Sequence, residues 1–81
     1  MWHVYIVECI DLSLYTGITL DVDRRVKEHN HSAKSAKSLR YKRPVRLVHT
    51  EMFKTHSEAA RREYEIKHWK REEKLKLITG A

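Results

Sequence analysis

The chain of 81 residues has few of the residues that form disulfides or interrupt helices and strands: one cysteine, one proline and two glycines. A single cysteine, Cys9, cannot close an internal disulfide and has no partner for a Cys-x-x-Cys metal motif. This excludes a disulfide-rich secreted scaffold and a structural zinc module. The low content of glycine and proline, together with 41% hydrophobic residues, also excludes a disordered or collagen-like chain. Packing must therefore hold the fold, and we interpret Cys9 as a small core residue.

Long apolar runs are also absent. The longest near the N-terminus, Val4 to Val7, is four residues, whereas a membrane-spanning helix needs about 20. No basic region with an apolar segment and a cleavage site is present, so we expect a cytoplasmic protein with no membrane partner. The length suits one domain over residues 1–81, without room for a separate regulatory domain.

Acidic residues are scarce in the middle of the chain. The formal net charge is +6, yet from Arg24 to Arg46 nine Lys and Arg residues accompany one acid, Glu28, which gives this segment a net charge of +8. Such a concentration of positive charge favours a polyanionic partner, because each phosphate neutralised by Lys or Arg releases condensed counterions. A solvated basic face that serves solubility is the alternative that charge alone leaves open.

Residues rich in β-branched and aromatic side chains predict three strands. They are residues 2–9, 13–18 and 45–49. The first two form a hairpin in this interpretation, with Asp11 marking its turn. Tyr5 and Tyr15 then lie on neighbouring strands, and Gly17 follows Tyr15 by two residues. The missing side chain of Gly17 would let a ligand approach closely, although packing is the ordinary role of a strand tyrosine.

Helical spacing and capping signals predict three helices. They cover about residues 21–30, 56–69 and 71–78. Thr19 or Asp21 can cap the first helix, and Thr55 with Glu58 forms a capping box at the second. Residues 31–42 lack periodicity and are rich in Ser and Lys, so they predict a mobile loop.

Helical geometry places one arginine of the first predicted helix beside the core. With Val22 as the origin, Arg25 lies at about 300° and Arg24 at about 200°. Arg25 therefore borders the apolar face, whereas Arg24 faces solvent.

The second predicted helix carries a carboxylate in its apolar stripe. Glu63 lies at about 40° from Ala59, whereas Glu65 lies at about 240°. Burying an unpaired carboxylate costs free energy, so Glu63 should meet a cation or a metal ion. A Glu63–Arg25 ion pair that ties two helices together is the structural alternative.

The tripeptides Val4-Tyr5-Ile6 and Tyr15-Thr16-Gly17 resemble the two halves of the GIY-YIG nuclease signature, apart from Val4 in place of glycine. The resemblance spans nearly the whole chain and is nearest to short bacterial members that consist of this domain alone. It continues through Arg24-Arg25, His29-Asn30, Ala36-Lys37, Arg43-Pro44-Val45 and Arg62-Glu63. Ser38 and Leu39 depart from the Tyr-Thr usual after Ala-Lys. The resemblance implies an α+β fold with a small three-stranded, mostly antiparallel sheet flanked by helices.

The resemblance also implies a metal-dependent DNA endonuclease that needs no small-molecule cofactor. Glu63 would bind Mg²⁺, with Mn²⁺ as a possible substitute. Arg25 would hold the phosphate, Tyr15 would take a proton from water, and Tyr5 would orient the water or phosphate. His29 is either a general-base candidate behind them or a hydrogen-bonded core histidine.

Nucleic-acid contacts are expected from the basic loop and its surroundings. The candidates are Lys34, Lys37, Arg40, Tyr41, Lys42, Arg43 and Lys67. One small groove suits a few nucleotides of flexible strand, so we expect a monomer that prefers single-stranded or locally unpaired DNA. The alternative function is a nucleic-acid-binding module that keeps the nuclease fold without efficient cleavage.

Overall fold

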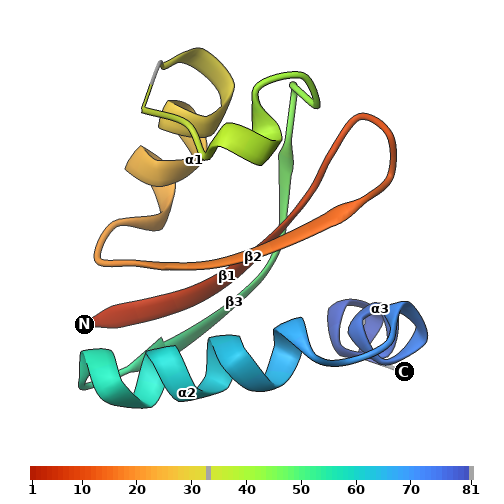
Figure 1. Ribbon diagram of the computed structural model, residues 1–81. Helices are drawn as coiled ribbons and strands as arrows, with labels where there is room; N and C mark the ends of the chain where they lie inside the picture. The colour runs from red at the N-terminus through yellow and green to blue at the C-terminus, as the bar shows by residue number, and fades with distance from the viewer. Residues whose placement is uncertain (33, 81) are drawn as a thin grey trace.

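The computed structural model describes residues 1–32 and 34–80, and it consists of one small sheet with helices on both sides (Figure 1). The strands are β1 (Trp2–Glu8), β2 (Leu14–Thr19) and β3 (Arg46–Phe53), in the order β2-β1-β3 with both pairs antiparallel. The helices are α1 (Val22–His31), the 3₁₀ turn η1 (Lys37–Leu39), α2 (His56–Lys67) and α3 (Arg71–Thr79). The predicted α+β fold is confirmed.

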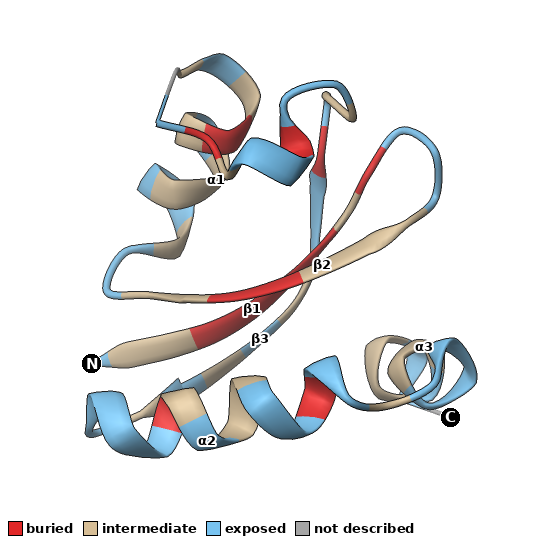
Figure 2. Cartoon of the chain, in the orientation of Figure 1, coloured by how far each residue is buried: buried red, intermediate tan, exposed pale blue. Residues whose placement is uncertain are grey.

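The two faces of the sheet each bury a separate apolar cluster, because successive side chains of a strand point to opposite sides. On the α1 side, Tyr5, Val7 and Cys9 pack with Leu39 and Val45. The other face is covered by α2, where residues 4 and 6 of β1 meet the buried residues of that helix. Figure 2 shows these buried positions along the middle of β1 and on α2. The core position predicted for Cys9 is confirmed.

Strand β3 runs four residues further than predicted. The sequence indicated 45–49, whereas the strand covers Arg46–Phe53. Residues 50–53 pair with Trp2–Tyr5 of β1. This long-range pairing extends the strand through residues whose mixed polar and apolar sequence does not by itself indicate a strand. At the hairpin, the Asp11 carboxylate accepts hydrogen bonds from the Ser13 amide (3.0 Å) and hydroxyl (2.6 Å), which confirms the turn.

The capping predictions hold at the two main helices. The Asp21 side chain accepts from the Arg24 amide at 3.1 Å, so Asp21 rather than Thr19 caps α1. Both bonds of the Thr55–Glu58 capping box are present at α2. Within the described residues, no helix has the length and apolar character needed to cross a membrane.

Residues 34–42, which belong to the segment predicted as a mobile loop, include a short helical turn that packs on the core. The segment contains η1, whose Leu39 is 1% exposed and packs in the α1-side cluster. The Ile10 amide also donates to the Lys42 carbonyl at 3.1 Å, which joins the segment to the β1–β2 hairpin. Ala33 lies outside the described residues. One core leucine in a polar stretch has no periodic pattern, which is why the sequence did not reveal this anchor.

Candidate active site

Two tyrosines and a histidine form the aromatic centre of the site. Tyr5 of β1 and Tyr15 of β2 have ring centroids 6.3 Å apart. His29 of α1 lies 5.8 Å from Tyr5 and 5.5 Å from Tyr15, ring to ring. The two tyrosines are thus neighbours, as predicted, and His29 of α1 lies beside both.

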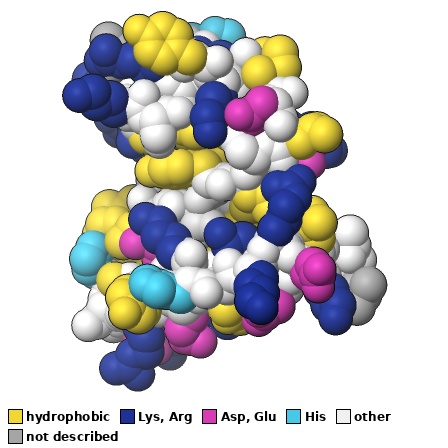
Figure 3. All heavy atoms as spheres, turned by 45° about the vertical axis from the view of Figure 1, so that its right-hand side comes forward, with side chains coloured by type: hydrophobic (Ala, Val, Ile, Leu, Met, Phe, Trp, Pro, Cys, Tyr) yellow, Lys and Arg dark blue, Asp and Glu magenta, His cyan; other side chains and the backbone are white. Residues whose placement is uncertain are grey.

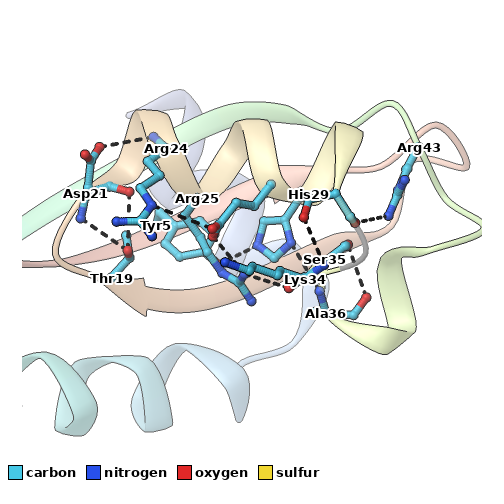
Figure 4. Close-up of polar contacts among 12 residues, drawn as sticks. Tyr5, Thr19, Asp21, Arg24, Arg25, His29, Lys34, Ser35, Ala36 and Arg43 are labelled. Atoms are coloured by element: carbon cyan, nitrogen blue, oxygen red, sulfur yellow. Dashed lines mark hydrogen bonds and ion pairs between the residues drawn. The ribbon is translucent and has the colours of Figure 1, made fainter.

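Both ring nitrogens of His29 are engaged (Figure 4). The Ala36 amide donates to Nδ1 at 3.4 Å, and Nε2 lies 2.7 Å from the Tyr5 hydroxyl oxygen. Because an amide only donates, Nδ1 carries no proton, so the neutral imidazole is protonated on Nε2 and donates to Tyr5. Burial lowers the pKa of His29 to about 4, helped by the nearby Arg25 charge. His29 is therefore a neutral, hydrogen-bonded core histidine at physiological pH.

Tyr5 is buried beside His29, and burial raises its pKa to about 12, with Tyr15 adding to the effect. Its hydroxyl stays protonated in neutral solution. Since its oxygen accepts from His29, its own proton remains available to a further acceptor. The positive charge of Arg25 lowers the pKa of Tyr5, whereas the negative charge of Glu63 raises it, as burial does. Both charges therefore lie within electrostatic reach of Tyr5.

Arg25 lies at the edge of the buried face, as its helical angle predicted. Its side chain is 26% exposed, against 71% for Arg24. Its Nη1 donates to Glu28 at 3.2 Å and to the Lys34 carbonyl at 2.9 Å. Burial opposes the charged form, but Glu28 and Tyr5 hold the pKa of Arg25 above its ordinary value. The guanidinium is thus a fixed positive charge next to the aromatic centre.

Glu63 of α2 supplies the carboxylate. Its side chain is 22% exposed and lies 3.5 Å from Lys67 Nζ, whereas the Glu65 side chain is 50% exposed. The alternative Glu63–Arg25 ion pair is wrong, since Arg25 pairs with Glu28 one turn along its own helix. No group of three or more His, Cys, Asp or Glu side chains comes together in the described residues. A single partly buried carboxylate fits Mg²⁺, which keeps several waters and takes few protein ligands.

Gly17 makes room for Tyr5 rather than for a ligand. The two residues are direct partners across the β1–β2 pair. A Cβ on Gly17 would lie 2.6 Å from the Tyr5 hydroxyl oxygen and 2.7 Å from Cζ. The expectation of close ligand approach at Gly17 is therefore wrong, because the tyrosine ring already fills that space.

Residues 1–76 match the model of the GIY-YIG catalytic domain. The chain belongs to the GIY-YIG family. It is 52% identical to the UPF0213 protein SSP2268 of Staphylococcus saprophyticus, over 95% of this chain and 93% of that protein. It is 57% identical to the UPF0213 protein HQ_3675A of Haloquadratum walsbyi, over 93% and 83%. The solution NMR structure of the UPF0213 protein BH0048 from Bacillus halodurans superposes with a TM-score of 0.62, at 51% identity, over 98% of this chain and 84% of that one.

The residues predicted to contact nucleic acid divide into two groups in this GIY-YIG domain. One group is exposed and includes Lys37, Arg40 and Tyr41, the last at 94%. Lys34 is also exposed, but it borders a hollow on the outer side of α1 with Arg24 and Lys27. Lys and Arg side chains are spread over the upper part and the waist of the face in Figure 3.

The other predicted contact residues are held by protein groups. Arg43 is partly buried; it donates to the Ser32 carbonyl at 2.7 Å at the end of α1, and its Nε is buried. Lys42 lies 3.3 Å from the Ser13 hydroxyl and 3.6 Å from Asp11. Lys67 pairs with Glu63. The contacts of these three side chains with nucleic acid stay predictions.

Two elements of the GIY-YIG site escaped the sequence analysis. Glu28 positions Arg25, and its spacing of three residues from Arg25 on a helix was the available signal. The Ala36 amide fixes the tautomer of His29, and a main-chain contact of this kind leaves no trace in residue type.

Replacing Gly17 by alanine should displace the Tyr5 ring and lower both cleavage and thermal stability. The new methyl meets the tyrosine at less than a normal contact distance, and overpacking costs about 1–3 kcal/mol. Melting temperature and cleavage rate measure the two effects. Gly80→Ala is the matched control, because Gly80 has φ 73° with nothing within 4 Å of the added Cβ. It should lose stability only, and equal cleavage by both variants would contradict this role of Gly17.

Stability should fall in mild acid because of His29. The unfolded histidine binds a proton near its ordinary pKa of 6.5, whereas the folded one does so near 4. The stabilisation is complete above pH 6.5 and is lost as the pH falls towards 4, by up to about 3 kcal/mol. Denaturant unfolding across this window measures the slope. His29→Gln should flatten it, whereas His31→Gln, an exposed position on the same helix, should not.

Proposed function

We propose that this protein acts as a monomeric, divalent-metal-dependent endonuclease that hydrolyses phosphodiester bonds of single-stranded or locally unpaired DNA. The observation that carries the proposal is the joint placement of Tyr5, Tyr15, His29 and Arg25 around one centre, with Glu63 in electrostatic reach, in a GIY-YIG catalytic domain. A module that only binds nucleic acid has no need of a carboxylate next to the bound phosphates.

Hydrolysis requires an activated water, stabilisation of charge on the phosphorus oxygens, and help for the leaving oxygen. Arg25 serves the second need. Because Nη1 makes both bonds to Glu28 and the Lys34 carbonyl, the guanidinium keeps N–H groups on its other nitrogens for the non-bridging oxygens of a phosphate.

The roles of the tyrosines follow from their surroundings. Tyr5 stays protonated and is fixed by His29, so it orients the water or the phosphate by donating its free proton. Tyr15 is less buried than Tyr5, and we assign it the removal of a proton from the attacking water. His29 is a positioning residue in this scheme, since both its nitrogens are already engaged.

Glu63 would hold Mg²⁺, or Mn²⁺ in its place, with water completing the coordination shell. The ion supplies positive charge that offsets the charge developing on the leaving oxygen. Lys67, 3.5 Å from Glu63, would contact the same phosphate or hold the carboxylate in place.

The preference for single strands is supported by the size of the domain and by its exposed groups. The domain measures 28 × 27 × 18 Å, and the basic segment from Arg24 to Arg46 includes the ring of Tyr41, which is 94% exposed. Cationic side chains that follow a backbone, with an aromatic ring that stacks on bases, suit a flexible strand.

Incubating the purified protein with labelled single-stranded and duplex DNA of one sequence, at fixed salt, tests the proposal. We expect cleavage with Mg²⁺, none with a chelator, and faster cutting of the single strand. Equal rates on blunt duplex would contradict the preference. Binding without cleavage under any divalent cation would favour the alternative, a nucleic-acid-binding module.

A further inference from the structure

Helix α2 carries an exposed pair of aromatic rings. The rings of Tyr64 and His68 lie 4.1 Å apart, centroid to centroid, at an interplanar angle of 34°, which is close to an offset stack. The Nδ1 atom of His68 lies 2.7 Å from the Tyr64 carbonyl oxygen. Because a carbonyl only accepts, Nδ1 carries a proton and donates, and this bond fixes the histidine ring against the tyrosine. Tyr64 is still 66% exposed, so the ring face that points away from His68 is open to a ligand.

The aromatic pair lies beside the candidate metal ligand on the surface of α2. This helix covers one face of the sheet, with the buried Ala59 towards the strands (Figure 1). Measured from Ala59, Glu63 lies at about 40° around the helix and Tyr64 at about 140°. Lys67, which pairs with Glu63 at 3.5 Å, lies between them at about 80°. A strand that crosses Glu63 and Lys67 therefore meets the ring of Tyr64 next.

The charges on this sector of α2 suit an anionic chain. Arg61 lies one turn before Tyr64, is exposed, and forms no ion pair with the described residues. From Glu63 around to Arg61 the sector holds no second acid. Glu65, on the far side of Arg61, pairs with Arg62 at 3.7 Å. An aromatic face with one cation on each side matches a nucleotide, whose base is flanked by two phosphates.

We propose that the open face of Tyr64 stacks on the base of the nucleotide that carries the leaving oxygen. This inference rests on the proposed function, in which the ion held by Glu63 offsets the charge on that oxygen. The leaving nucleotide then lies over α2, and the nucleotide on the other side of the scissile phosphate does not. Both faces of a base inside an intact duplex are covered by its neighbours, so the stack takes an unpaired base and favours single strands.

Removing the base itself tests the proposal. The substrate is a single strand in which the position of cleavage by the wild-type protein has been mapped. One abasic nucleotide on the leaving-group side of that phosphate should slow cleavage by about tenfold, whereas one on the other side should slow it by no more than about twofold. Equal effects on the two sides would overturn the inference.

Tyr64→Ala removes the same contact from the protein side. The position is exposed and alanine favours helix, so we expect an unchanged melting temperature. The variant should cleave the intact strand about tenfold more slowly, and it should no longer distinguish this strand from the one with the abasic leaving nucleotide. A merely structural role of Tyr64 would slow both substrates alike, and that result would refute the stack.

Two further variants complete the experiment. Tyr64→Phe keeps the ring and should restore the discrimination between the intact and the abasic strand. Met52→Ala is the matched control, because Met52 is an apolar side chain of similar exposure, 62%, on β3. It should behave as wild type on both strands.

Binding separates failure of this inference from failure of the proposed function. A fluorescent base analogue in a short single strand should lose emission when it stacks on the wild-type protein in the presence of a chelator, and not with Tyr64→Ala. Equal emission with the two proteins would overturn the inference even if the DNA is cut. A concentration-dependent dimer that Tyr64→Ala abolishes, with DNA binding intact, would also overturn it. Loss of emission without cleavage under any divalent cation would refute only the nuclease.

Discussion

Glu63→Gln should abolish cleavage while leaving DNA binding intact or slightly stronger. The substitution keeps the shape of the side chain but removes the charge that would hold the metal ion, and it takes a negative charge away from the bound phosphates. A loss of about 10³-fold or more in cleavage rate is expected, since charge stabilisation by the ion is worth several kcal/mol. Single-turnover cleavage and a binding isotherm at the same salt measure the two properties.

Glu65→Gln is the control for this experiment. It lies on the same helix with its side chain 50% exposed, and it pairs with Arg62 at 3.7 Å rather than with the site. We expect wild-type cleavage. If Glu63→Gln cuts as fast as this control, Glu63 is not the metal ligand.

Arg25→Ala should reduce cleavage by about 10²-fold or more, because the phosphate would lose its charged, planar donor. Arg24→Ala should stay within about threefold, since that side chain faces solvent. Arg25→Lys should recover little, because an ammonium cannot bond Glu28, the Lys34 carbonyl and a phosphate in the same plane. Cleavage rates at equal saturation with DNA measure all three.

Arg25 also joins α1 to the following segment through the Lys34 carbonyl, so its loss can lower stability as well. Melting curves of the three variants separate the two effects. Comparable cleavage losses for Arg24→Ala and Arg25→Ala, in proteins of equal stability, would show that neither arginine has a special position.

Helical phase was the most informative signal in the sequence. It separated Arg25 from Arg24 and Glu63 from Glu65, and the exposed fractions of the side chains follow that order. Phase succeeds because a helix has a fixed rotation per residue, so one apolar position orients all the others.

The contacts that the sequence did not reveal depend on register or on irregular backbone. Gly17 faces Tyr5 only because of the strand pairing, which no local pattern states. Leu39 reaches the core through a 3₁₀ turn in a segment without periodicity. Nothing in the sequence distinguishes Arg43 from a surface cation, whereas in the structure it donates to the Ser32 carbonyl at the end of α1. Tertiary contacts rather than local sequence patterns decide each of these positions.

The main-chain origin of the bond to His29 constrains how this site can vary during evolution. Residue 36 contributes its N–H to this bond, so an amino acid that fits the partly buried position of Ala36 and keeps the amide preserves the tautomer of the histidine. Proline is the exception. Ala36 has φ −54°, which a proline ring adopts without strain, so proline would fit the backbone and delete nothing but the hydrogen. At position 36 the bond to His29 therefore selects against proline, whereas the space beside the core limits the size of the side chain.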